Sequence, residues 1–149
     1  MDKPLVNRVA NSGIITINLE DHYPQQEIVV FDLKDYLFKE LILKEKDFRS
    51  ALKEFDWEQL DGKILLVHCS SDAIIPVWAY MLVASHASPN ATEIFQGTQK
   101  EYLKNHYNSV ISELDVQQFE NQRIVIKGCS NKPVPPSAYA DLTLSLIHI

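Results

Sequence analysis

The sequence has few glycines and none of the common catalytic or metal-binding motifs. Its four glycines stand singly, at positions 13, 62, 97 and 128, so there is no phosphate-cradling loop of the P-loop or dinucleotide-binding type. It holds no CxxC, HExxH or GxSxG pattern, which leaves standard zinc, metalloprotease and hydrolase sites without support. We therefore expect no metal site and assign no cofactor.

Concentrated positive charge and long apolar runs are also missing. The net charge is -6 and no basic cluster offsets it, so nucleic acid and anionic membranes are not expected as partners. No apolar run reaches the roughly 18 residues of a membrane-spanning helix, and the first residues do not resemble a signal peptide. The two cysteines are expected to be free thiols in a reducing compartment, and we expect a cytoplasmic protein.

The residues that are present predict an α/β fold. Two short β-rich runs at 13–20 and 27–33 open the chain as a pair of strands, interpreted as a hairpin, and two helices at 35–43 and 48–55 follow. The order then becomes β-α-β-α-β-α, which is typical of a mainly parallel sheet flanked by helices. These strands are expected at 63–69, 92–96 and 123–129, and the helices at 76–85, 98–114 and 135–143. We expect one domain over residues 1–143.

Two stretches of the sequence echo each other, VHCSSDAIIPVWAY at 67–80 and KGCSNKPVPPSAY at 127–139. Each runs from a strand into Cys-Ser and then, after a proline, into a helix containing Ala-Tyr. We interpret them as an internal repeat, with both Cys-Ser pairs expected at one edge of a single parallel sheet. The second copy lacks a strand matching 93–97, so the repeat predicts a truncated C-terminus.

The last six residues, 144–149, read LSLIHI. This is the translation of a transposon-end sequence used in common sequencing libraries. We expect this tail to be adapter-derived and not native, and we exclude it from fold reasoning.

Four strings carry a resemblance to a known family: VNRVANSGIITINLED, FDLKDYLFKELILKEKDFR, CSSDAIIPVWAYML and VIKGCSNKPVPPSAY. Over residues 5 to 143 the chain resembles the bacterial family called domain of unknown function 2480 (DUF2480). The family name assigns no activity. The resemblance implies a bacterial origin and an association with iron-sulfur assembly genes.

The best candidate site lies where the two Cys-Ser strands end. Ligands of open parallel sheets bind beyond the carboxyl ends of strands, and helix N-termini there favour an anion or a thiolate. The candidate binding residues are Cys69, Ser70, Ser71, Asp72, Cys129, Ser130, Asn131 and Lys132. The competing interpretation is structural, with buried cysteines and serines that cap helices. Arg8 is a further candidate for an anion, or else the partner of an ordinary surface salt bridge.

Three functions remain open. The first is a noncatalytic binding or accessory module, in which the apolar helix after Pro76 or an open sheet edge docks a partner. The second is a thiol protein that handles sulfur or an iron-sulfur or metal centre through Cys69 and Cys129. The third is a small-molecule enzyme with an anion site at the helix N-termini. No catalytic base stands in a recognisable motif, so the sequence favours a protein that is not an enzyme.

Overall fold

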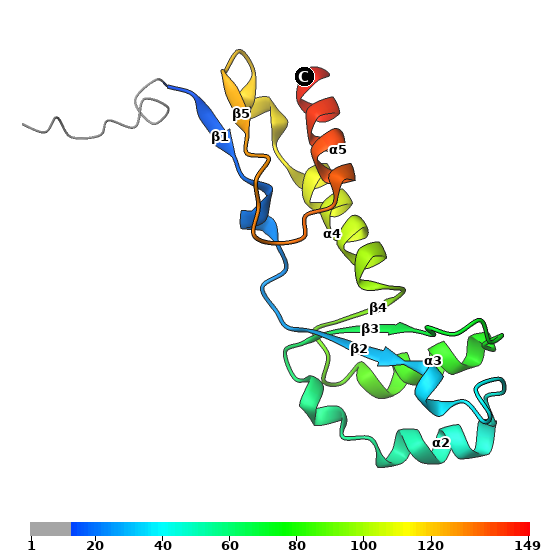
Figure 1. The fold of residues 1–149 in the computed structure, drawn as a ribbon. Coiled ribbons are helices and arrows are strands. Elements are labelled where there is room, and N and C mark those ends of the chain that lie inside the picture. The colour runs from blue at the N-terminus through cyan, green and yellow to red at the C-terminus, as the bar shows by residue number, and fades with distance from the viewer. Residues whose placement is uncertain (1–12) are drawn as a thin grey trace, which may run out of the picture. The chain divides into compact units, whose positions relative to one another are not determined.

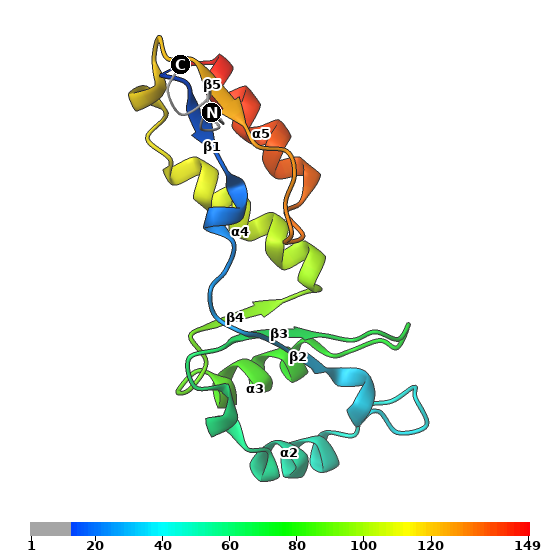
Figure 2. The same cartoon turned by 60° about the vertical axis from the view of Figure 1, so that its left-hand side comes forward.

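A computed structural model describes residues 13–149, and the contacts of the chain divide it into two compact units (Figures 1 and 2). Unit 1 comprises Met1–Tyr23 and Leu103–Ile149, and unit 2 comprises Pro24–Tyr102. In sequence, unit 2 is therefore a continuous insert between the two segments of unit 1. The single domain predicted over residues 1–143 stays a prediction, which an unfolding experiment described below tests.

Unit 2 is built on a three-stranded parallel sheet. Its strands are β2 (Ile28–Asp32), β3 (Ile64–His68) and β4 (Glu93–Gln96), in the order β2-β3-β4. The central strand β3 is aliphatic over four successive residues that are all buried, as expected for a parallel strand covered on both faces. The predicted α/β class with mainly parallel sheets is confirmed.

The helices of unit 2 cover one face of this sheet (Figures 1 and 2). They are the 3-10 helices η2 (Leu33–Tyr36) and η3 (Trp57–Leu60) and the α-helices α2 (Glu45–Glu54) and α3 (Val77–Ala87). Apolar residues from β2, β3 and the helices form its core. Its buried members are Phe31, Leu33, Leu43, Phe48, Leu52, Leu60, Leu65, Val67, Ala79, Val83 and Ala87.

The predicted helix at 35–43 is wrong. The chain forms η2 and then a tight hairpin at 38–42, in which Phe38 and Ile42 bridge antiparallel. The hairpin needs positive φ angles at Lys39 and Glu40, 51° and 61°, which are incompatible with a right-handed helix. The predicted helix at 48–55 is confirmed as α2.

Unit 1 holds a two-stranded parallel sheet formed by β1 (Ile15–Ile17) and β5 (Ile124–Ile126). Its helical elements are η1 (Leu19–His22), α4 (Gln99–Glu113), η4 (Val116–Phe119) and α5 (Pro136–Ile147). Its buried core residues are Ile17, Leu19, Tyr107, Ile111, Ala138 and Leu142. Helix α4 crosses the boundary between the units in sequence, and Thr98 and Glu101 form a capping box at its start, with the Glu101 amide donating to Thr98 Oγ1 at 3.3 Å.

Strand pairing corrects two expectations. The first two strands form no hairpin, because β1 pairs with β5 while β2 pairs with β3, and the expected turn between them is partly taken up by η1. The strands that precede Cys69 and Cys129 do not belong to one sheet, since β3 lies in the sheet of unit 2 and β5 in that of unit 1. The prediction that both Cys-Ser pairs share one sheet edge is therefore wrong.

Candidate functional site

The strand end after β3 is organised around the Asp32 carboxylate. Its Oδ1 accepts hydrogen bonds from the amide of Ser70 at 3.1 Å and from the amide of Lys34 at 2.9 Å. Burial alone would raise the pKa of Asp32, but the hydrogen bonds from Ser70 and Lys34, with a smaller contribution from His68, outweigh it and lower the pKa. An anion approaching Ser70 would therefore meet an amide already engaged by a carboxylate.

Cys69, at the same strand end, is half-buried against the core of unit 2. Its Sγ lies 3.3 Å from Ser71 Oγ, and that hydroxyl also accepts the amide of Ala73 at 3.4 Å. Proximity to Cys69 contributes, after burial, to a raised pKa of Tyr80. Asp72 is exposed beside them.

The strand end after β5 is more open. Cys129 is exposed. The Ser130 hydroxyl donates to the Lys132 carbonyl at 2.9 Å and accepts the Lys132 amide at 3.1 Å, so it closes a local turn. The Asn131 amide donates to Glu20 Oε2 at 3.4 Å. The Glu20 carboxylate thus accepts a backbone amide that an anion bound here would need, as Asp32 does at the other strand end.

The predicted site residues thus form two separate groups. Ser70, Ser71 and Asp72 lie with Cys69 in unit 2, and the other predicted residues of this set lie with Cys129 in unit 1. Neither helix that follows has a side-chain cap, since prolines occupy both N-cap positions. Arg8 falls outside residues 13–149, which the structure describes. Within that range no three histidine, cysteine or acidic residues gather to hold a metal ion, and no helix is long and apolar enough to cross a membrane.

An exposed apolar stripe on unit 2 is the clearest surface feature near these strand ends. Ile74, Val77 and Met81 are 91%, 76% and 68% exposed. Their spacing places Val77 and Met81 on one face of α3, while the opposite face buries Ala79 and Val83. The apolar sequence of α3 is therefore only partly covered by the core of unit 2. We call the exposed surface of Ile74, Val77 and Met81 the α3 stripe.

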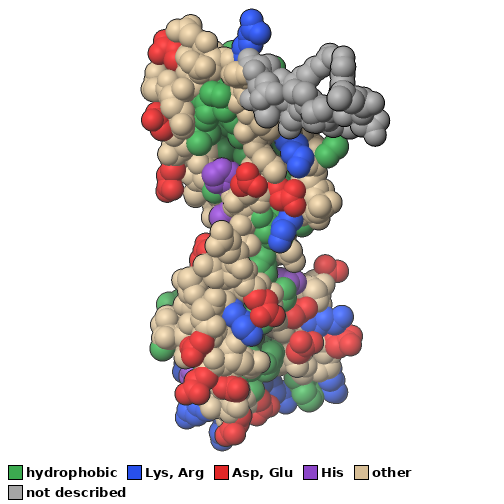
Figure 3. Space-filling view, turned by 90° about the vertical axis from the view of Figure 1, so that its left-hand side faces the viewer, with side chains coloured by type: hydrophobic (Ala, Val, Ile, Leu, Met, Phe, Trp, Pro, Cys, Tyr) green, Lys and Arg blue, Asp and Glu red, His purple; other side chains and the backbone are tan. Residues whose placement is uncertain are grey.

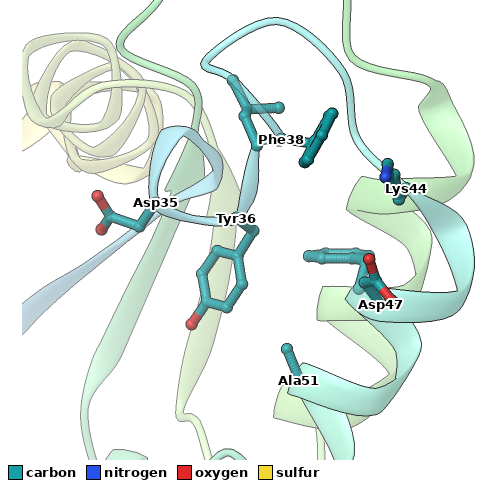
Figure 4. A pocket seen from close by; sticks show the side chains of 8 residues that line it. Asp35, Tyr36, Phe38, Lys44, Asp47 and Ala51 are labelled. Atoms are coloured by element: carbon teal, nitrogen blue, oxygen red, sulfur yellow. The ribbon is translucent and has the colours of Figure 1, made fainter.

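The hairpin at 38–42 and a small pocket beside it were missed by sequence reasoning. Phe38, Leu41 and Ile42 are exposed on the hairpin. Figure 4 shows the pocket, about 280 Å³ in volume, between the hairpin and α2, with Tyr36 and Asp47 among its lining residues. The lining combines aromatic rings with charged groups, which suits a side chain of a partner.

Lys44 occupies part of this surface. Its Nζ lies 3.6 Å from the centroid of the Phe38 ring, within cation-π range. The run FKELILK at 38–44 resembles helical sequence, so the only available signal for the surface was its high density of apolar residues.

Charge gives no further indication of a ligand. Acidic and basic side chains are interspersed on the face drawn in Figure 3, and the chain carries a net charge of -6.

Comparison with known proteins gives one match. Residues 3–149 match the family described as protein of unknown function (DUF2480). No curated protein and no solved structure matches the chain.

Proposed function

Because the chain belongs to the family described as protein of unknown function (DUF2480), a description that assigns no activity, we propose a function from the structure. The chain is a noncatalytic binding or accessory module that docks a protein partner through the α3 stripe. The observation that carries this proposal is the exposure of Ile74, just before α3, and of Val77 and Met81, one turn apart on α3.

The exposure of the α3 stripe has an energetic cost that binding would remove. A surface helix ordinarily presents polar residues to water. Burying one large aliphatic side chain contributes about 1.5–3 kcal/mol, so covering the α3 stripe would stabilise a complex substantially. The fold does not require apolar residues there, because the core contacts of α3 come from Ala79, Val83 and Ala87.

The strand ends support this proposal more than the enzyme alternative. The amides of Ser70 and Asn131 are engaged by Asp32 and Glu20. An anionic substrate would have to displace these carboxylates against their charge. A protein partner is therefore better supported than an anionic small-molecule ligand.

The experiment compares partners retained by three forms of the chain. Tagged wild type, a Val77→Lys/Met81→Lys variant and a Ser50→Lys control are used as baits in lysate of the source cells, and retained proteins are quantified by mass spectrometry. Ser50 is exposed on α2 of the same unit. We expect specific partners to be lost only from the α3 stripe variant, with all three baits equally folded by circular dichroism.

Two outcomes would contradict the proposal. Retention of the same proteins by wild type and the α3 stripe variant would show that the stripe does not bind them. Retention of the chain's own copies alone, with a dimer measured by light scattering, would replace a foreign partner by self-association.

Further expectations from the sequence belong to this proposal. A cytoplasmic location in bacteria fits the two free cysteines, because free thiols persist in reducing compartments. The adapter origin of residues 144–149 is a proposal too. Leu144 and Ile147 are exposed on the last turns of α5, while Leu146 packs against the core of unit 1. Sequencing the source DNA through this point tests that origin.

A further inference from the structure

The two units share six elements in the same order. Unit 2 runs β2, η2, α2, η3, β3, α3, and unit 1 runs β1, η1, α4, η4, β5, α5. In each unit the first strand pairs in parallel with the second, β2 with β3 and β1 with β5. The correspondence therefore extends far beyond the short Cys-Ser stretches that the sequence shows to be similar.

Individual residues match at the start of the two units. Asn18 and Asp32 are the N-caps of η1 and η2, and each side chain accepts a hydrogen bond from the amide two residues further on. These amides belong to Glu20 and Lys34. The residue that follows each cap, Leu19 or Leu33, is buried in the core of its unit.

The second halves match equally well. A residue with positive φ follows each of η3 and η4, Gly62 at 70° and Asn121 at 59°. Prolines at the N-caps of α3 and α5, Pro76 and Pro135, have nearly identical backbone angles, with φ of -63° in both and ψ of 142° and 140°. We infer that the units are two copies of one motif.

The copies differ at one strand. In unit 2, β4 pairs along the outer edge of β3, where the amide of Thr92 donates to the Lys63 carbonyl at 2.8 Å and the amide of Gly97 donates to the Val67 carbonyl at 2.9 Å. Unit 1 has no counterpart of β4 among the described residues. The strand that corresponds to β3 therefore pairs on one side only.

Within residues 13–149, the other side of β5 has no backbone partner. The Arg123 carbonyl and the Lys127 amide are bonded to β1, each at 2.9 Å. Because backbone groups alternate along a strand, the amides and carbonyls of Ile124 and Ile126 point away from β1. By the correspondence of the units, this is the edge that β4 covers on β3.

The edge of β5 is short and apolar. Its three residues are Ile-Val-Ile, without a proline or a charge between the flanking Arg123 and Lys127. Soluble proteins generally cover an apolar edge of this kind. Both the correspondence of the units and the composition of the edge indicate a missing strand.

We propose that the edge of β5 formed by Ile124 and Ile126 receives a parallel strand from the natural polypeptide that follows α5. In unit 2 the connection between α3 and β4 spans residues 88–92, and a connection of similar length leads to the proposed strand. The proposal rests on the correspondence between the units and is independent of the α3 stripe.

A graft tests whether the edge accepts such a strand. Residues 88–97, with the sequence SPNATEIFQG, are added after Ile147 in place of the last two residues. Amide hydrogen exchange of Ile124 and Ile126 is measured by NMR in the chain with and without the graft. We expect the graft to slow exchange of both amides by roughly tenfold or more, because they become hydrogen-bonded within a sheet.

The matched control carries proline in place of the phenylalanine of the grafted EIFQ, because the register of β4 on β3 points the amide of Phe95, not that of Ile94, towards β3. Proline removes a donor from the middle of the added strand, and we expect exchange of Ile124 and Ile126 to return to the ungrafted rate. Equal exchange in the graft and its proline control would overturn the proposal. Protection of both amides in the ungrafted chain, together with a dimer by light scattering, would assign the edge to a second copy instead.

Expression of the full source gene tests whether the proposed strand comes from the natural polypeptide after α5. The chain is expressed as the assembled genomic DNA encodes it, through its stop codon. We expect residues beyond α5 and protected amides at Ile124 and Ile126. A stop codon directly after residue 149, or an extended product with both amides unprotected, would overturn the proposal.

Discussion

Unit 2 and unit 1 use the same order of elements but differ in how much they bury. Among the described residues, unit 2 has fourteen buried apolar residues and unit 1 has seven. The larger core surrounds a cluster of rings in which Phe31 stacks on Tyr36 at 4.9 Å between centroids. Unit 2 therefore has both the third strand and the larger aromatic core. We expect the two-stranded unit 1 to depend more on contacts beyond its own core.

Truncation of one core residue in each unit is expected to cause the largest change in the free energy of unfolding. Leu52 on α2 and Ile111 on α4 are both buried. We expect Leu52→Ala and Ile111→Ala each to lower the free energy of unfolding by about 2–5 kcal/mol, with Leu52→Ala at the upper end. Urea unfolding is followed by circular dichroism, which reports both units, and by tryptophan fluorescence, since both tryptophans lie in unit 2.

The same measurement tests the predicted single domain. A single cooperative domain gives coincident midpoints by the two signals in both variants. A fluorescence midpoint that stays unchanged in Ile111→Ala while the dichroism midpoint falls would show that the units unfold separately.

The hydroxyl of Tyr107 distinguishes the two cores at one position. Tyr107 and Phe48 are both buried on helices that precede η4 and η3, and Tyr107 Oη donates to the Leu19 carbonyl at 2.8 Å. We expect Tyr107→Phe to cost about 1–3 kcal/mol, because a buried carbonyl loses its partner. Phe48→Tyr should be similarly destabilising in unit 2 if no acceptor is nearby. A neutral effect of both substitutions would show that hydroxyl placement does not distinguish the cores.

Tyr107 also predicts a pH dependence. Burial, with smaller contributions from neighbouring groups, raises the pKa of Tyr107 from the ordinary tyrosine value of 10.0 to about 12. The folded state therefore keeps this proton at pH values where the unfolded state releases it. The contribution to stability is fully present below pH 10 and is lost as the pH rises through about 12. Unfolding of Tyr107→Phe should lack this loss, and an identical decline in both proteins would contradict the assignment.

The caps of η1 and η2 give a smaller difference. Asp32 holds two amides from separate segments, whereas Asn18 caps one amide. We expect Asp32→Ala to cost about 1–2 kcal/mol and Asn18→Ala about 0.5–1 kcal/mol. Since the pKa of Asp32 is lowered from 3.8, its contribution is present above that value and is lost as the pH falls below it. Equal losses of unfolding free energy in Asp32→Ala and Asn18→Ala at neutral pH would contradict the expected difference between the two caps.

The reactivity of the two cysteine thiols tests the comparison between the units without a measurement of unfolding. Cys129 is exposed and Cys69 is half-buried, so we expect iodoacetamide to modify Cys129 at least about tenfold faster. Mass spectrometry of the single variants Cys69→Ser and Cys129→Ser measures each rate separately. Equal rates would show that the strand end after β3 opens readily, which would revive the thiol alternative for Cys69.

Sequence patterns located most elements, because each depends on local periodicity. The aliphatic run at 64–67 indicated β3, and the Thr98–Glu101 capping box indicated the start of α4. The hairpin at 38–42 escaped prediction because Lys39 and Glu40 adopt left-handed angles that their side chains do not favour.

Strand partners were harder to predict than strands. A parallel ladder between distant segments leaves no local signal, so nothing in the sequence indicated that β1 pairs with β5 across the whole of unit 2. The candidate site assumed that the strands before Cys69 and Cys129 share one sheet. Because β5 pairs with β1 instead, the two cysteines lie in separate units. The α3 stripe was accessible to prediction only as an apolar helix, since sequence alone does not reveal which of its faces is covered.

The insertion of unit 2 into unit 1 also sets an order of synthesis. All residues of unit 2 leave the ribosome as one stretch, whereas β1 must wait for β5, more than a hundred positions later. At about 5–20 residues per second, this delay is on the order of 5–20 s. During that interval unit 2 acquires its complete set of strands, while the apolar β1 still lacks β5. Nascent chains should therefore reach native structure from the middle outwards, and chaperones that act during translation would meet the first segment of unit 1 before any other unpaired strand.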